Sequence, residues 1–427
     1  AVCPNPQITR FSPTAGPIKG STLITVTGIN LGKVYSDISA LVAGKPCTVK
    51  PDPYQPATRF VCEVEQIDSE TSGAISVTVD GKYTAKSDSE FNFVDPVLSS
   101  LTPSAGPVSG GIIVTLLGDH LDIGSEIQVK MTSGVCQIVK QNKTALECQV
   151  PAQNVKSTGE KIEVIFGGYR KEVPDVFVYK PDPTVNMIEP LKSIMSGGTS
   201  ITIRGDGLNL IQKPEFVTKY GEKHFREGCE VLTDYMMECK VPAINSPNIN
   251  ITETSPLEVH YWFNMANVTS LRNISYNGFG PMLYYPDPSI TYFEEEDRTK
   301  TFHETDMLSI QGRFRMVNSL MASVRVFVGD EPCSQTEAND LSITCKPPTS
   351  TPKGTDDSGK APVTVRIGNM RSVPGYLRYF LPSENSKPIT LGVVLGVALP
   401  IVFIVVLLTI CVLRRHRKHK PEENFIP

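Results

Sequence analysis

The sequence predicts an all-β chain of four tandem β-sandwich modules followed by one transmembrane α-helix. Three observations support this: a sequence unit recurs four times, eight of the ten cysteines fall into close pairs, and one long apolar stretch lies near the C-terminus. Gly at 32 and Pro at 34 favour many turns and few long helices. A chain of 427 residues exceeds what one hydrophobic core supports, so several domains are expected.

The recurring unit begins at Pro6, Pro96, Pro183 and Pro288. Its copies are about 90 to 105 residues apart, which is the size of one small β-sandwich. The fourth copy keeps the plan but reads EEEDRTKTFHETD where the others have central glycines.

The third copy shows the expected local structure. Ile201 and Ile203 alternate with polar residues, as in a strand with one buried face. Gly197 and Gly198 before this strand and Gly205 after it are expected at tight turns with positive φ.

The repeat also sets the boundaries of the predicted parts of the chain. Almost no linker separates the copies, because an aromatic last strand runs directly into Asp-Pro or Pro-Asp-Pro, and each proline restricts the torsions around it. The modules should therefore form a stiff array. The predicted parts are the end of an upstream module (1–5), four modules (6–95, 96–181, 182–287 and 288–382), a juxtamembrane linker (383–388), the helix (389–413) and a basic cytoplasmic tail (414–427).

The cysteine pairs predict disulfides in an oxidising compartment. No pair has the CxxC spacing of a zinc or redox site, and no histidine stands beside them at ligand spacing. Each pair should close within one module, whereas Cys3 should find no partner in this chain. The pairs are Cys47 with Cys62, Cys136 with Cys148, Cys229 with Cys239, and Cys333 with Cys345.

The stretch from Ile389 to Leu413 carries no charge and at ~1.5 Å per residue spans ~37 Å, enough to cross a bilayer. Arginines and lysines follow it, from Arg414 to Lys420, so the tail should be cytoplasmic and the repeats extracellular. The expected location is the plasma membrane, as a single-pass type I protein, with the basic tail contacting anionic lipid.

Two features of this predicted helix leave alternatives open. Gly392 and Gly396 form a GxxxG motif that favours a homodimer, although glycine is also common in membrane helices. Cys411 suits either palmitoylation or simple apolar packing.

Four N-x-S/T sequons lie in the predicted extracellular part, at Asn142, Asn250, Asn267 and Asn273. The last three lie in the extra length of the third copy, which indicates an exposed insertion. The only tryptophan, Trp262, lies close to them in sequence.

Two sequence patterns resemble known families. The pattern GP-x-x-GG-x-x-(I/V)-T-(I/V)-x-G, followed by a cysteine pair, resembles the IPT/TIG domain, which implies an immunoglobulin-like sandwich. Four such units before a membrane helix, with VAGKPCTVKPDPYQPATRFVCEV in the first and LYYPDP after the third, resemble the plexin family of semaphorin receptors. The fold class that the resemblance implies is four tandem immunoglobulin-like (IPT/TIG) β-sandwiches followed by one transmembrane helix.

The plexin resemblance also implies parts beyond this chain. Plexins carry an upstream sema propeller that binds semaphorin and a cytoplasmic region that acts on small GTPases. Cys3 would be the remnant of a small PSI module. The implied function is an extracellular stalk and membrane anchor; a tyrosine kinase receptor similar to the hepatocyte growth factor receptor, and an adhesion protein, are the alternatives.

Other functions lack support in the sequence. The formal charge of -4 and the absence of a basic stripe exclude nucleic acid as a partner. No hydrolase, metalloprotease or phosphate-loop motif indicates an enzyme, and no cofactor is expected. His120, His224, His260 and His303 are scattered, and the carboxylates from Glu294 to Asp297 lack the alternating spacing of a calcium loop, so no metal site is predicted.

Overall fold

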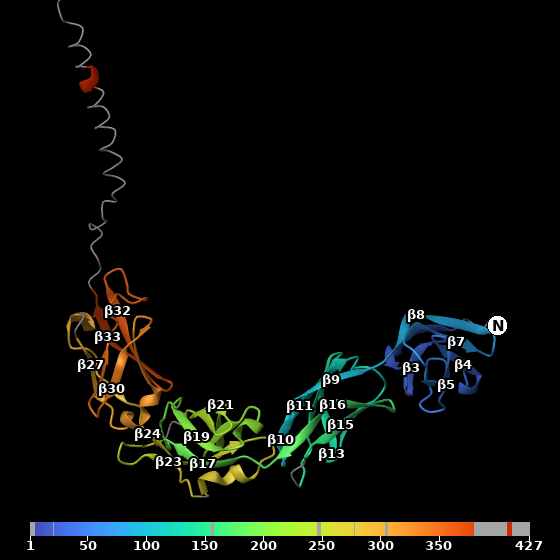
Figure 1. Ribbon diagram of the computed structural model, residues 1–427, viewed down its shortest axis with the longest axis horizontal. Helices are drawn as coiled ribbons and strands as arrows, with labels where there is room; N and C mark the ends of the chain where they lie inside the picture. The colour runs from blue at the N-terminus through green and yellow to red at the C-terminus, as the bar shows by residue number, and fades with distance from the viewer. Residues whose placement is uncertain are drawn as a thin grey trace, which may run out of the picture.

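Four β-sandwich modules follow one another in a curved row in the computed structural model, from the blue N-terminal module to the orange fourth module (Figure 1). The structure describes residues 5–19, 21–154, 158–245, 249–276, 278–303, 306–379 and 408–411. The predicted all-β architecture of tandem sandwiches is confirmed for these modules.

The first module is one eight-stranded sheet that folds over on itself, in the order β1-β3-β6-β5-β4-β7-β8-β2. Its two edge strands are consecutive in sequence: β1 pairs antiparallel with β3, and β2 pairs parallel with β8. The chain thus switches from one layer to the other between them. Its elements are β1 (Gln7–Ser12), β2 (Ala15–Pro17), β3 (Thr22–Ile29), η1 (Tyr35–Asp37), β4 (Ile38–Val42), β5 (Lys45–Val49), β6 (Arg59–Val64), β7 (Thr71–Val79) and β8 (Tyr83–Val94).

The second and third modules repeat this order of strands. The second contains β9 (Val97–Thr102), β10 (Ala105–Pro107), β11 (Ile113–Asp119), β12 (Ile127–Met131), β13 (Gly134–Gln141), β14 (Ala145–Gln149), β15 (Glu160–Phe166) and β16 (Tyr169–Lys180). The third contains β17 (Thr184–Glu189), β18 (Lys192–Ile194), β19 (Ser200–Asp206), η2 (Leu208–Leu210), β20 (Glu215–Tyr220), β21 (Lys223–Thr233), β22 (Met236–Lys240), β23 (Leu257–Asn264), η3 (Ser270–Tyr276) and β24 (Met282–Tyr285).

The fourth module keeps the plan as two separate sheets, β25-β27-β31-β30 and β26-β33-β32-β28-β29. The short helix η4 lies between β25 and β26, and β26 pairs parallel with β33 as in the other modules. The elements are β25 (Ser289–Ile290), η4 (Glu296–Arg298), β26 (Thr299–Thr301), β27 (Leu308–Arg313), η5 (Val317–Ser323), β28 (Val324–Val328), β29 (Glu331–Pro332), β30 (Ser334–Ala338), β31 (Ser342–Lys346), β32 (Lys360–Ile367) and β33 (Met370–Arg378).

The third module confirms the predicted strand period. Ile201 and Ile203 on β19 are both fully buried, and Gly197 and Gly198 adopt φ values of 64° and 73°. The prediction of positive φ at Gly205 is wrong, because this residue lies within β19, opposite Val185 of β17. A Cβ there would collide with the carbonyl oxygen of Thr184, so the glycine allows the two strands to approach closely at a β-bulge.

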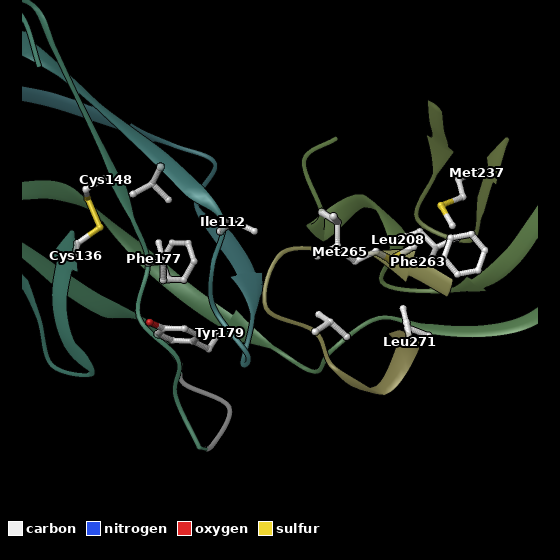
Figure 2. Close-up of a cluster of buried hydrophobic side chains, with 14 of the residues drawn as sticks. Ile112, Cys136, Cys148, Phe177, Tyr179, Leu208, Met237, Phe263, Met265 and Leu271 are labelled. Atoms are coloured by element: carbon white, nitrogen blue, oxygen red, sulfur yellow. A yellow bond between two sulfur atoms is a disulfide. The ribbon is translucent and has the colours of Figure 1, made fainter. Parts of the chain in front are cut away.

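The hydrophobic cores are not fully separate. One cluster of buried side chains extends through the second and third modules, and Figure 2 shows its two halves facing each other across the module boundary. Ile194 of the third module belongs to the cluster that fills the fourth. Packing therefore continues from one module into the next.

Candidate functional site at the module joints

Consecutive modules meet at three joints, which we number from the N-terminus, and each uses the same positions of the repeat. A backbone N–H two residues after the glycine turn donates to a side-chain oxygen of the next module. Each acceptor lies just before β12, β20 or β28, which are equivalent strands. The pairs are Leu23 with Ser125 Oγ at 3.2 Å, Ile113 with Gln212 Oε1 at 3.1 Å, and Ser200 with Ser323 Oγ at 2.7 Å.

Joint 2 has a second hydrogen bond between the same two residues. The Nε2 of Gln212 also donates to the carbonyl oxygen of Ile113 at 2.8 Å. One planar amide thus satisfies both backbone groups of the residue at which β11 begins. This arrangement fixes the side chain in two directions and joins the first residue of β11 to the third module.

At joints 1 and 3, the glycine turn also forms hydrogen bonds with the next module. Its partner there is the turn that connects the last two long strands of that module. At joint 1, the N–H of Ser21 donates to the carbonyl oxygen of Gly167 at 2.9 Å. At joint 3, Asn369 donates its N–H to Gly197 O and its Nδ2 to Ser196 O, each at 3.0 Å.

Close approach explains the second glycine of the turn at joints 2 and 3. A Cβ on Gly111 would lie 2.5 Å from Cγ of Asn267, and a Cβ on Gly198 would overlap the amide of Asn369. Both glycines also have positive φ. A larger residue would therefore separate the modules as well as strain the turn.

The aspartates between modules tie each connecting segment to the module that it leaves. The carboxylate of Asp182 accepts the N–H of Ser109 at 2.9 Å and also its hydroxyl. Asp287 accepts the N–H of Ser196 at 2.9 Å and also its hydroxyl. Because the two serines hold the same position beside the glycine turn, the connecting segment and the docking surface are fixed together.

Joint 1 replaces this contact with an ion pair. The position of Ser109 is occupied by Lys19 in the first module. Asp95 instead pairs with Lys171 of the second module at 2.8 Å, with both side chains about a third exposed. Burial alone would lower the pKa of Lys171, but its contacts with Asp95 and Tyr169 outweigh that effect and raise it. The lysine is therefore firmly charged at neutral pH.

These contacts restrict the motion between modules. Domains within one chain move relative to each other by default unless their interface is well packed. Here each boundary combines a short proline-containing connection, directed hydrogen bonds and, at joint 2, a continuous apolar cluster that includes Ile112 and Met265 (Figure 2). This arrangement can transmit the position of one module to the next.

The structure closes all four expected cysteine pairs, each within one module. Their Cα atoms are 4.1 to 5.8 Å apart. In the third module, Cys229 and Cys239 face each other across β21 and β22.

The four sequon asparagines are exposed but lie in different surroundings. Asn142 forms the turn between β13 and β14, where its Oδ1 accepts the N–H groups of Thr144 and Ala145, each at 2.9 Å. Asn250 precedes the short bridge between Thr252 and Ser255. Asn267 lies at joint 2, and Asn273 lies on η3.

Several predicted residues lie outside the described residues: Cys3, Gly392, Gly396 and most of 389–413. Residues 408–411 are helical, and Cys411 is an exposed free thiol. Across the ranges that the structure describes, no helix is long and apolar enough to span a membrane. The same ranges contain no cluster of His, Cys, Asp or Glu that could hold a metal ion.

Sequence reasoning missed the residues that build the joints. The sequence predicts turns at the glycine pairs, but it does not mark these turns as docking surfaces. Ser125 and Gln212 each follow the glycine of the preceding strand by seven residues, but Ser323 follows its glycine by eleven, and no one residue type is common to the three. The histidines are scattered in the sequence, whereas the structure places His224 and His260 on either side of Lys219.

Comparison with known proteins supports the architecture. Residues 6–93, 96–179 and 183–265 match the model of the IPT/TIG domain family. The chain is 29% identical to Plexin-A3 of Homo sapiens over 406 residues, which cover 92% of this chain and 21% of that protein. It is 30% identical to Plexin-A4 of Mus musculus over 417 residues, which cover 95% of this chain and 21% of that protein.

A solved structure of the full extracellular region of Plexin A4 aligns with a TM-score of 0.67 and 30% sequence identity. The alignment covers 87% of this chain and 30% of the other. The chain spans about a fifth of the length of the curated relatives named above.

Proposed function

The chain belongs to the plexin family, and on this premise we propose that it is the extracellular stalk and membrane anchor of a single-pass receptor. The stalk holds a ligand-binding head at a set distance and angle from the membrane. It couples movement of that head to a cytoplasmic region. The observation that carries this proposal is the threefold repetition of one joint geometry, because a stalk that transmits orientation needs the same restricted contact at every boundary.

Membrane anchoring is the second part of the proposal. The uncharged stretch 389–413 would span the bilayer, and the basic residues 414–420 would lie at its cytoplasmic face against anionic lipid. Gly392 and Gly396 would join two such helices in a homodimer. In this proposal the protein lies in the plasma membrane with its modules outside the cell.

The partners follow from the family. A head upstream of the stalk would bind semaphorin, and a cytoplasmic region downstream would act on small GTPases. The stalk itself carries no catalytic role in this proposal. The proposed modules comprise residues 6–95, 96–181, 182–287 and 288–382, and glycans are proposed on Asn142, Asn250, Asn267 and Asn273.

Flexible insertions in the full-length receptor test the proposal. A Gly/Ser segment placed after Asp182 or Asp287 should loosen joint 2 or joint 3, lowering cytoplasmic output while semaphorin binding at the cell surface stays the same. The control is the same insertion after Gly44, in the exposed turn between β4 and β5, where nothing packs against the glycine. Unchanged output in a normally displayed joint variant would show that the stalk does not act through stiffness.

A further inference from the structure

The outer face of the third module carries a groove of about 670 Å³. Cross-strand pairing explains its composition. On β20, Lys219 lies opposite His224 of β21 on one side and opposite His260 of β23 on the other, which makes one row of three basic side chains. In the next row, Trp262 lies opposite Val217, which is fully buried.

Neighbouring side chains hold the Trp262 ring in a fixed orientation. Its Nε1 donates to Oδ1 of Asn264 at 3.2 Å, and Nδ2 of Asn264 donates to Glu215 at 3.0 Å. The imidazole of His224 meets the indole edge-on, with ring centroids 5.2 Å apart. Since the only polar group of the indole is already satisfied, what the half-buried ring offers to the groove is an apolar surface.

A sequon asparagine forms part of the groove wall. Strand β23 pairs with β24 only over Leu257–Val259. Beyond that point η3 runs beside it, and the N–H of Tyr261 donates to Oγ of Ser275 at 3.4 Å. This contact places Asn273, the acceptor of the Asn273-Ile274-Ser275 sequon, in the lining of the groove together with Trp262. Asn273 itself is exposed.

The remaining lining favours a carbohydrate. Lys219, His224, His260 and Arg272 offer hydrogen-bond donors, and no carboxylate lies among the described residues that line the groove. A sugar presents the complementary groups: hydroxyl and N-acetyl carbonyl oxygens as acceptors, and a C–H face that packs on an aromatic ring. A glycan tethered at the groove wall is also present at a high effective concentration, which a free saccharide lacks.

We infer that this groove seats the N-linked glycan of Asn273, with its proximal N-acetylglucosamine packed on the indole of Trp262. The inference rests on the proposed glycosylation of Asn273 and adds a structural role for that glycan. The glycan covers an aromatic side chain on an otherwise open sheet face and ties η3 to β20 and β21. The carbohydrate then forms part of the packed surface of the third module.

Tryptophan fluorescence provides the test, because Trp262 is the only tryptophan in the chain. The full chain is produced in a eukaryotic secretory pathway, and occupancy of Asn273 is read by peptide mass spectrometry. Acrylamide quenching is then measured before and after enzymatic release of the glycans under native conditions. Release should raise the quenching constant and shift the emission to longer wavelength.

Matched variants assign the effect to one sequon. Asn273→Gln should reproduce the change caused by glycan release, whereas Asn142→Gln in the second module should leave the fluorescence of Trp262 unchanged. An unoccupied Asn273 would refute the glycosylation on which the inference rests. An occupied Asn273 with identical quenching before and after release would refute the docking alone. Protection of Trp262 by an added sulfated polysaccharide in the glycosylated chain would show an open groove and would also overturn the docking.

Discussion

The phenolic O–H of Tyr284 donates to the carbonyl oxygen of Pro242 at 2.9 Å, and both residues lie in the core of the third module. The same kind of bond occurs in the second module between Tyr179 and Pro151, at 2.8 Å, and in the fourth between Tyr379 and Pro348, at 3.0 Å. Each proline follows the second disulfide cysteine by three residues. The bond therefore joins the last strand to the segment that leaves the disulfide.

The first module lacks both the tyrosine and the proline. Phe93 lies opposite Gly16 just as Tyr179 lies opposite Gly106, and Glu65 stands where the other modules have proline. The first module therefore has no tyrosine hydroxyl to form this bond, although Glu65 still carries a backbone carbonyl.

Removing the hydroxyl should weaken one module at a time. Tyr284→Phe should lower the stability of the third module by about 1 to 1.5 kcal/mol, because a buried hydrogen bond is lost and the proline carbonyl is left unpaired. Hydrogen exchange of the full chain, followed by mass spectrometry of module-specific peptides, measures the change. Faster exchange should be confined to peptides of the third module.

The reverse substitution provides the control. Phe93→Tyr should destabilise the first module by about 1 to 3 kcal/mol, because the packed core around this 1% exposed side chain must make room for an additional oxygen atom. A neutral result for both Tyr284→Phe and Phe93→Tyr would show that the hydroxyl bond does not contribute to stability.

High pH should destabilise the modules that contain these tyrosines. Burial raises the pKa of Tyr179 and of Tyr379 to about 12 and also raises the pKa of Tyr284. The folded state keeps these protons at pH values where the unfolded chain, with a tyrosine pKa of about 10, releases them. Their contribution is thus complete below pH ~10 and is lost as the pH rises towards 12.

Thermal unfolding between pH 9 and 12 measures this loss. The reference is a variant with Phe at positions 179, 284 and 379, because all other titrating groups contribute equally to the two proteins. The melting temperature of the parent chain should fall more steeply with pH than that of the triple variant. Parallel curves would contradict the assignment of the alkaline loss to these side chains.

The sequence predicted the modules better than their joints, for a physical reason. Burial along a strand repeats with a period of two, so Ile201 and Ile203 predict a buried face. Closely spaced cysteines likewise predict a disulfide. A joint residue such as Gln212 acts through one side-chain amide in a loop, and nothing in its neighbours distinguishes it from any exposed glutamine. Gly205 is a second example. A glycine is needed there because β17 and β19 approach closely, and this approach is known only once the two strands are paired.

The proposed membrane helix should self-associate through its small residues. Replacing Gly392 and Gly396 with isoleucine should weaken the dimer, since larger side chains hold the two backbones apart and remove the packing that drives association in lipid. A two-hybrid assay in a bacterial membrane measures it, with Val393→Ile and Val397→Ile as a control at the same spacing. Equal signals from both double variants would mean that the glycines are only typical membrane-helix residues.

Loss of the Gln212 amide should loosen joint 2. In Gln212→Ala, both backbone groups of Ile113 lose their partners in the third module, while the core residues on either side stay in place. Spin labels on the second and third modules of the full chain report the distance between them by pulsed electron resonance. The distance distribution should broaden, whereas the control Lys223→Ala, in an exposed position of β21 away from the joint, should leave it unchanged.

A second substitution at the same joint separates loss of a bond from loss of contact. Gly111→Val places a branched side chain against Asn267 and at a φ of 84°, so the modules must move apart and the mean distance itself should increase. If Gln212→Ala broadens the distribution and Gly111→Val shifts it, the joint works as a packed contact held in register by one amide. If neither variant changes the distribution, the stiffness of the array must come from the Pro-Asp-Pro segments alone, and the joints do not transmit orientation between modules.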